Sequence, residues 1–134
     1  MSFKKISIIS TQILLYYSNI YVTVLCMKIK EYVREDNSNP YEKWFNSLNI
    51  QAAAKVAVAI ARIELGNISN IKWFEGIGEY RINWGSGYRI YLAQDGKELI
   101  ILFGGGTKKK QSRDIKKAKD LFEEYKVRKK KKKR

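Results

Sequence analysis

The sequence predicts an α+β domain, because its strand and helix patterns are grouped along the chain instead of alternating one by one. An alternating stretch opens at residue 28, helical patterns follow between residues 39 and 65, and strand patterns fill residues 79 to 103 before a last helical pattern. With 134 residues and one proline, the chain fits a single compact domain.

Positive charge is abundant and unevenly distributed. The net charge of +14 indicates a polyanionic partner. Eight basic and no acidic residues lie from Lys126 onward, and two lysines lie near the N-terminus, which leaves +4 for residues 27 to 125. Within that part, residues 104 to 119 carry seven basic residues against Asp114 alone.

The residue types limit the chemistry. The chain has one cysteine and no histidine. An intrachain disulfide, a Cys/His metal site and a histidine-based catalytic group are therefore excluded. Any chemistry must use Arg, Lys, Tyr or carboxylate side chains, and we expect neither a metal ion nor a cofactor.

Residues 1–26 precede the expected domain and are uncharged from Ile6 onward. Two lysines followed by an apolar run resemble a signal peptide or a weak membrane anchor. Polar residues interrupt the run, however, and no convincing cleavage site follows it. We favour Met27 as the true start, and we leave open an export or membrane segment and a genuine structural extension. Unless the segment is genuine, we expect no membrane association and a cytoplasmic protein.

The first half of the domain is expected to hold one strand and two helices. The strand is expected over residues 28 to 33, which alternate in polarity. Asn39 is placed to cap a short helix over about residues 40 to 48, with proline at its first position. A second helix is expected over about residues 49 to 65, where Gly66 provides the stop.

Residues 79 to 103 are expected to form three antiparallel strands after a loop that carries Trp73. Asp95-Gly96 is a type I′ hairpin signal, and a turn centred on it pairs Leu92 with Leu99 on one face. The strand after this turn is apolar throughout, which predicts a strand covered on both faces.

The register of the first hairpin decides where its arginines point. A three-residue loop at Gly85–Gly87 is the register that separates apolar from polar side chains. It pairs Arg81 with Tyr91. It also pairs Asn83 with Arg89. We therefore expect these four residues on one polar face, opposite a core face.

The last part of the chain is expected to turn and then form a helix. Gly104–Gly106 is expected to turn the chain at the end of the sheet. Ile115, Ala118 and Tyr125 form a helical stripe, which predicts a C-terminal helix with exposed lysines. Residues 126–134 are low in complexity, and we expect a disordered basic tail. Nonspecific affinity for nucleic acid and a solvated tail without a defined role are both left open for it.

Two motifs in the second half of the chain resemble a known family. Gly-Tyr-Arg-Ile-Tyr at residues 87 to 91 is followed by Gly-Gly-Thr-Lys-Lys-Lys-Gln-Ser-Arg-Asp-Ile at residues 105 to 115. Over residues 27–125 the chain resembles the RelE/ParE toxin superfamily, and specifically its HigB-like addiction module killer protein branch. The extension 1–26 and the tail 126–134 lie outside the family pattern.

The resemblance implies a fold, an activity and partners. The implied RelE-like fold is an antiparallel sheet packed against an N-terminal helical hairpin, with a C-terminal helix. Many members are metal-independent ribonucleases that enter the ribosome and cut mRNA by attack of the ribose 2′-hydroxyl on the adjacent phosphate. That reaction needs cations around the phosphorane, a base and an acid. The implied partners are the ribosome, mRNA and a small antitoxin, expected to be a helix-turn-helix protein.

The resemblance also implies site residues. The family's basic catalytic positions match Arg81, Arg89 and Lys109 here, and Lys108 or Lys110 could take the place of Lys109. The expected RNA-binding set consists of nearby basic and polar residues: Lys108, Lys110, Arg113 and Asn83.

The chain departs from the studied ribonucleases at two of their positions. Asn83 stands where they tend to carry a second basic residue, and Ile115 stands where they carry a catalytic tyrosine. Tyr91 is the expected substitute for that tyrosine, which requires the neighbouring cations to lower its pKa. Glu79 is expected to pair with a nearby arginine instead of acting as an acid or base.

Two other functions are compatible with the sequence. The same fold binds and poisons DNA gyrase without cutting in ParE-type relatives, and the missing C-terminal tyrosine favours such a non-enzymatic inhibitor. An inactive copy of the toxin is the third alternative.

Overall fold

The fold follows from a computed structural model that describes residues 26–134, so the extension predicted over residues 1–26 lies almost wholly outside the described residues. The α+β class is confirmed. One five-stranded mixed sheet is combined with three helices and one short 3-10 turn in this part of the chain. No helix within residues 26–134 has both the length and the apolar character needed to cross a membrane.

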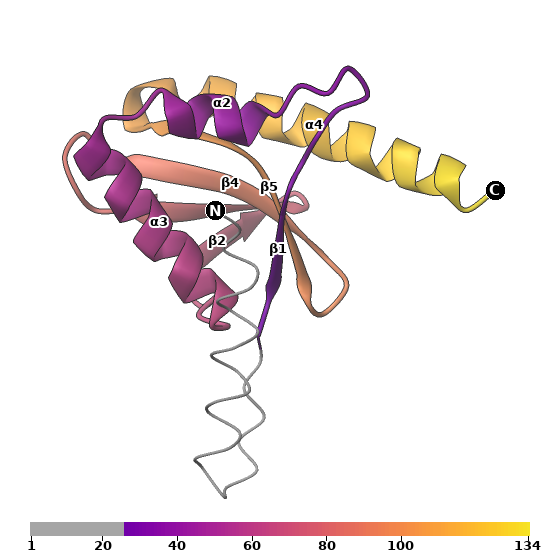
Figure 1. Ribbon diagram of the computed structural model, residues 1–134, viewed down its shortest axis with the longest axis horizontal. Coiled ribbons are helices and arrows are strands. Elements are labelled where there is room, and N and C mark those ends of the chain that lie inside the picture. Colours follow the sequence, from indigo (N-terminus) through magenta and orange to yellow (C-terminus); the bar gives the residue numbers. More distant parts are fainter. Residues whose placement is uncertain (1–25) are drawn as a thin grey trace, which may run out of the picture.

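One strand opens the domain, two helices follow it, and four consecutive strands then lead to the C-terminal helix (Figure 1). The first half of the domain contains β1 (Lys28–Glu31), α2 (Pro40–Asn46) and α3 (Ile50–Glu64). The central strands are β2 (Ile71–Phe74), β3 (Ile77–Ile82), β4 (Tyr88–Asp95) and β5 (Leu99–Thr107). A 3-10 turn (Lys108–Lys110) leads into α4 (Gln111–Lys132).

The helix starts predicted from the sequence are confirmed. The Asn39 side chain accepts a hydrogen bond of 3.0 Å from the backbone of Glu42 at the start of α2. The Asn49 side chain accepts one of 2.8 Å from Ala52 at the start of α3. Each cap satisfies a backbone N–H that has no partner within its helix.

The sheet is mixed, so an entirely antiparallel sheet is the wrong expectation. The strand order is β1-β5-β4-β3-β2, and β1 pairs with β5 in parallel, whereas the other neighbours are antiparallel. The parallel pairing arises because α2 and α3 carry the chain away from β1 before the antiparallel strands begin.

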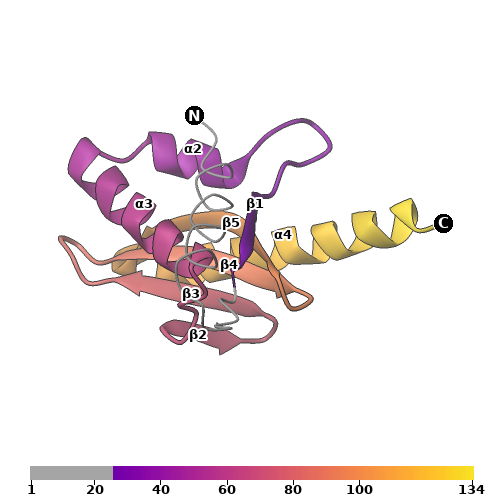
Figure 2. The ribbon, with the colours of Figure 1, turned by 60° about the horizontal axis from the view of Figure 1, so that its bottom comes forward.

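Helices cover the sheet on two sides (Figure 2). The side chains of α2 and α3 pack with one face of the sheet in an apolar cluster that includes Val56, Ile63, Ile90 and Leu102. Helix α4 packs on the other face in a second cluster of buried residues: Tyr32, Ile77, Tyr91, Ala93, Ile101, Phe103, Ala118 and Leu121. Strand β5 is therefore central and covered on both faces, as its apolar sequence predicts.

The first hairpin has the predicted faces but not the predicted register. Ile82 pairs with Tyr88 and Arg81 pairs with Arg89, so the loop spans residues 83 to 87 instead of three residues. The loop uses positive φ at both Gly85 and Gly87. Because side chains alternate with a period of two, a shift by two residues leaves every side chain on its predicted face.

The second hairpin departs from the prediction in both register and faces. Asp95 pairs with Leu99, and Leu92 pairs with Leu102, with a bulge between Tyr91 and Leu92. Leu92 and Leu99 therefore do not pair. The strand after the turn is apolar at every position, so hydrophobic alternation did not indicate which register is correct.

Three further expectations are wrong. Trp73 belongs to strand β2, not to a loop. Gly104–Gly106 belongs to β5 and does not form a turn. Residues 126 to 132, expected to be disordered, continue helix α4.

Candidate functional site

The two arginines predicted for the site lie together on the α4 side of the sheet. Arg81 on β3 is paired directly with Arg89 on β4. Between them lies the carboxylate of Glu79, which is fully buried. Glu79 Oε1 is 2.9 Å from Arg81 Nε and 3.5 Å from Arg89 Nε. The expected ion pair of Glu79 is confirmed.

The two arginines differ in their exposure. The Arg81 side chain is 49% exposed, whereas the Arg89 side chain is only 8% exposed and donates a hydrogen bond of 3.2 Å to the carbonyl oxygen of Gly87. Arg81 is therefore available to a ligand, and Arg89 holds Glu79 in place. The expectation that both guanidinium groups face solvent is wrong, because the N-terminal part of α4 lies over Arg89.

Glu79 also ties helix α4 to the sheet. Gln111, the first residue of α4, donates a hydrogen bond of 2.9 Å from Nε2 to Glu79 Oε2. Burial opposes ionisation of Glu79, but the hydrogen bonds from Arg81 and Gln111 outweigh it and hold the pKa of this carboxyl below its usual value.

Tyr91 does not meet the requirement for a base. Its side chain is buried beneath α4, and its hydroxyl has no hydrogen-bond partner in the part of the chain that the structure describes. Burial, together with the nearby carboxylates of Glu79 and Asp114, raises the pKa of Tyr91. The condition for a base at Tyr91, a pKa lowered by the neighbouring cations, is therefore not met, since the effect of Arg89 is smaller than the opposing effects.

A groove opens between α2 and the first half of α4, next to this cluster. Its volume is about 1050 Å³, and its floor is formed by Gly104–Gly106 of β5 together with Tyr91 and Phe103. The absence of side chains on these glycines lets neighbouring side chains approach the strand, and of the three only Gly104 has open space where a Cβ atom would lie. A Cβ atom at Gly105 would lie 2.4 Å from the Trp44 ring, so this position has no room for a larger residue.

Four cations line the groove and lack an ion pair among residues 26–134. One comes from α2, one from the 3-10 turn and two from α4: Lys43, Lys110, Arg113 and Lys117. Unpaired cations that line one groove are suited to bind phosphate oxygens.

The remaining predicted residues lie nearby. Lys108 and Lys109 are exposed in the 3-10 turn, but they do not line the groove. Asn83 is exposed in the loop after β3, also outside the groove lining. The structure thus brings Lys110 and Arg113 into the groove.

Sequence reasoning missed two basic residues of the groove, Lys43 and Lys117, and assigned no role to the acidic residue Asp114. Lys110, Arg113 and Lys117 have helical spacing, so Lys117 was within reach of a pattern argument. Lys43 gave no such signal, because only the tertiary fold brings α2 next to α4.

Asp114 is the missed carboxyl. It packs against Gly106, where an added Cβ would lie only 2.0 Å from Asp114 Oδ2, and this oxygen is buried without a hydrogen-bond partner among the described residues. Burial raises the pKa of Asp114, although the charges of Arg113, Lys117 and Lys110 oppose this effect. A carboxyl group with a raised pKa holds its proton more readily than an ordinary Asp, which favours a role as a proton donor.

The fold and groove define an α+β domain with a basic site next to a buried arginine–carboxylate cluster. An uncharacterized protein of Haemophilus influenzae is 43% identical over 86 residues, which cover 63% of this chain and 87% of that protein. The chain belongs to the same family as the H. influenzae protein. No protein-family model and no solved structure matches the chain.

Proposed function

We propose that the chain is the toxin of a type II toxin–antitoxin module and cleaves mRNA on the ribosome. The observation that carries the proposal is the groove, which four cations line without an ion pair among the described residues. One part of the groove lining lies within residues 104 to 117, in the segment whose motif resembles the HigB-like branch of the RelE/ParE superfamily.

In the proposed RelE-like arrangement, α2 and α3 form the N-terminal helical hairpin that packs on the sheet, and α4 is the C-terminal helix. The groove lies where α2 and α4 approach each other, so an RNA strand in it contacts both. The proposed location of the protein is the cytoplasm, where ribosomes and mRNA are found.

The groove residues have separate roles in the proposed reaction. Lys110, Arg113 and Lys117 neutralise the phosphate on which charge develops as the 2′-hydroxyl attacks. Asp114, whose pKa is raised, donates a proton to the leaving 5′-oxygen. The exposed Arg81 contacts the RNA backbone next to the groove. The ribosome supplies much of the orientation of the RNA, which relaxes the need for a strong base, and the proton of the attacking 2′-hydroxyl passes to water.

The proposed partners follow from the charge of the site. A small antitoxin of the helix-turn-helix type neutralises the toxin by covering the basic groove. A short neighbouring reading frame that encodes such a protein would support the module, and co-expression with it should restore growth.

Induction of the protein in a bacterial host tests the proposal. Growth should stop, and mapping of mRNA 5′ ends should show new ends within translated codons. Lys110→Ala combined with Lys117→Ala should abolish these ends without unfolding the protein, because both side chains lie at the groove and outside the two apolar clusters. Growth arrest with intact mRNA would contradict the ribonuclease.

A second candidate function is inhibition of DNA gyrase without catalysis. Two observations favour it: Arg89 is buried, and the pKa of Tyr91 is raised, so the predicted catalytic set is not assembled as a whole. Under this alternative, induction leaves mRNA intact and changes plasmid supercoiling. An inactive copy of the toxin would produce neither effect.

A further inference from the structure

Helix α3 carries an apolar stripe on its outer side. The stripe combines three exposed large residues, Ile50, Val58 and Leu65, with the exposed alanines 54 and 61. Their exposed fractions are 88%, 49% and 55% for the three large residues. At about 100° per residue, the five positions fall within roughly 80° of arc along the whole helix.

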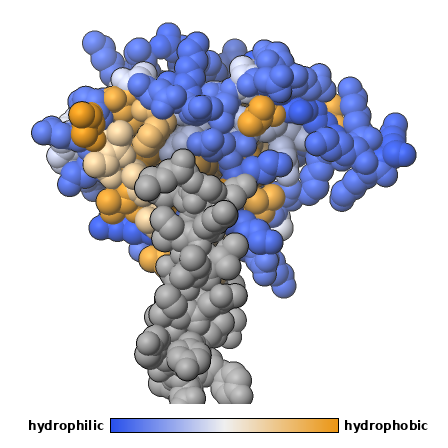
Figure 3. All heavy atoms as spheres, in the orientation of Figure 1, coloured by the Kyte–Doolittle hydropathy of each residue, from blue (hydrophilic) through white to orange (hydrophobic). Residues whose placement is uncertain are grey.

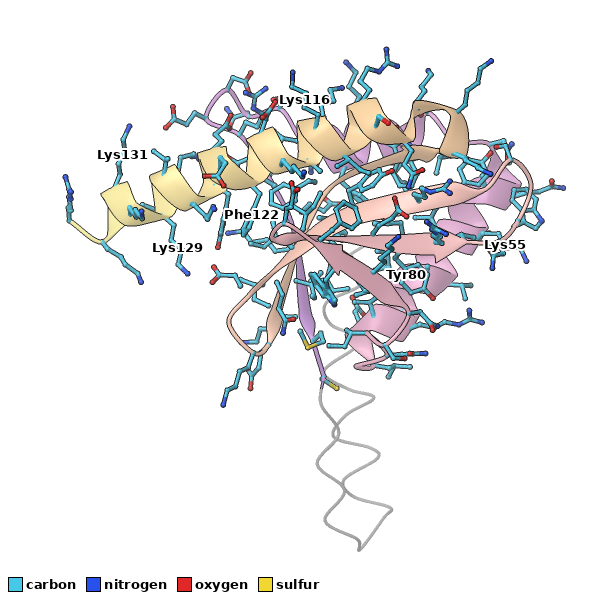
Figure 4. All side chains as sticks on the ribbon, turned by 180° about the vertical axis from the view of Figure 1, so that it is seen from behind. Lys55, Tyr80, Lys116, Phe122, Lys129 and Lys131 are labelled. Atoms are coloured by element: carbon cyan, nitrogen blue, oxygen red, sulfur yellow. The ribbon has the colours of Figure 1, made fainter. Side chains whose placement is uncertain are left out.

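This stripe lies opposite the face that α3 already buries. The buried residues are Ala52, Val56, Ala59 and Ile63, which pack on the sheet. The centre of the stripe is about 170° away from them at about 100° per residue. Gln51, Lys55 and Arg62 lie on one flank between the two faces at about 100° per residue, and Figure 4 shows Lys55 there. A helix with apolar residues on two opposite faces is typically covered by other parts of a structure on both faces.

The space-filling view agrees with this reading. Apolar residues gather over α3, whereas most of the remaining visible surface is hydrophilic (Figure 3). A continuous exposed apolar patch of this kind marks a surface that is normally covered.

The described chain begins next to one end of the stripe. The backbone N–H of Met27 donates a hydrogen bond of 2.9 Å to the carbonyl oxygen of Glu64, in the last turn of α3. Leu65, the end of the stripe, is the next residue. Residues 6–25, the 20 residues that precede Cys26, contain no charged residue and are rich in Ile, Leu, Val and Tyr.

The length of this segment matches the stripe. The stripe spans about 22 Å, since it covers 15 steps of ~1.5 Å along the helix. Twenty residues reach at least about 30 Å in any regular conformation. The segment is also tethered to the end of the stripe, so its effective concentration there is on the order of millimolar.

We propose that residues 6–25 cover the apolar stripe of α3 within the same chain. The segment is then part of the folded domain, and neither an export signal nor a separate membrane anchor. The inference does not depend on the toxin activity. The experiment distinguishes this contact from a second copy of the chain and from a stripe that is open in the isolated chain, as an occupant such as a protein partner or a membrane would require.

The test compares two engineered thiols in the full-length chain with Cys26→Ser. Val58→Cys lies on the stripe, and Val127→Cys lies on α4; the two valines are 49% and 51% exposed in the described part of the chain. Each rate of reaction with a thiol reagent is divided by that of the same variant in denaturant. We expect the ratio for Val58→Cys to be at least about tenfold smaller than the ratio for Val127→Cys. The reason is that the reagent reaches the covered thiol at position 58 only when the structure opens locally. Equal ratios would overturn the proposal.

Two further measurements identify the occupant. Ile13→Asp combined with Leu14→Asp should raise the Val58→Cys ratio to that of Val127→Cys, and persistent protection would overturn the proposal. Protection that grows with protein concentration would assign the stripe to a second copy and overturn it as well. Ala61→Cys, a smaller change on the same stripe, replaces Val58→Cys if that variant does not give the native circular dichroism spectrum.

Discussion

Glu79 on β3 and Gln111 at the start of α4 are joined by a hydrogen bond of 2.9 Å, although 32 positions separate them in the sequence. The other oxygen of the same carboxylate holds Arg81 and Arg89. One buried carboxylate therefore joins two strands to the C-terminal helix. Because Arg113 and Lys117 follow within two turns of this helix, the contact also fixes the position of the groove cations.

Removal of the charge of Glu79 should destabilise the fold. Glu79→Gln is expected to lower the free energy of unfolding by about 3 kcal/mol, because the buried Arg89 guanidinium loses its carboxylate. Urea denaturation measures the change. Glu98→Gln is the control, since Glu98 is exposed and has no ion pair within residues 26–134, and it should change the free energy by less than about 0.5 kcal/mol. Equal effects of the two substitutions would show that the Glu79 cluster contributes nothing to stability.

Acid should weaken the attachment of α4. Besides Glu79, two other carboxylates link α4 to the rest of the domain. Lys129 of α4 donates a hydrogen bond to Asp95 of β4, and Arg34 donates one to Glu124 of α4. These hydrogen bonds lower the pKa of Asp95 and Glu124, and the pKa of Glu79 is lowered as well.

The direction of the pH effect follows from these lowered values. A group whose pKa is lower in the folded state stabilises the protein above its unfolded pKa, and this contribution is lost as the pH falls through the folded value. We expect the free energy of unfolding to fall between about pH 6 and about pH 3. Urea denaturation at each pH checks this, and Glu124→Gln should reduce the slope. A free energy that does not change over this range would contradict the attachment.

The sequence predicts the side on which each residue of β3 and β4 lies, but not its burial. Alternation assigns Arg81, Arg89 and Tyr91 to one face, and a register error of two residues leaves that assignment intact. Helix α4 covers this face, and it starts 22 residues after Arg89. No local pattern indicates that α4 seals Arg89 and Tyr91 while Arg81 stays exposed.

Two features of the sheet could not be predicted from local sequence patterns. Strand β2 was missed because its turn is made by Glu75 and Gly76, both at positive φ, where a pattern search expects Asn or Asp before the glycine. The parallel pairing of β1 with β5 joins segments about 70 residues apart, which no short-range signal specifies.

The groove cations should contribute to RNA affinity according to their position. Lys117→Ala is expected to weaken binding of a single-stranded RNA and to reduce the slope of log affinity against log salt by about 0.7 for the lost phosphate contact. Filter binding at several salt concentrations measures the slope. Lys116→Ala is the matched control: the neighbouring Lys116 does not line the groove and points away from the sheet (Figure 4). Equal effects of both substitutions would show that RNA follows the general charge of α4 instead of the groove.

The carboxyl group in the groove should be needed for cleavage but not for stability. Because burial raises the pKa of Asp114, its ionised form opposes folding, and this cost is present above the folded pKa and absent below the unfolded one. Asp114→Asn should therefore be at least as stable as the parent at pH 7.

The same substitution should also separate catalysis from binding. RNA affinity should be unchanged or higher, because Asp114→Asn removes a negative charge beside the phosphate site. Ribosome-dependent cleavage should fall by a factor of about 10² to 10⁴, the usual loss on removal of a general acid. Asp120→Asn is the control on the same wall of the groove, since Asp120 is exposed to solvent and should retain full activity. Cleavage that survives Asp114→Asn would remove Asp114 from the reaction and leave the four cations of the groove as its RNA-binding residues.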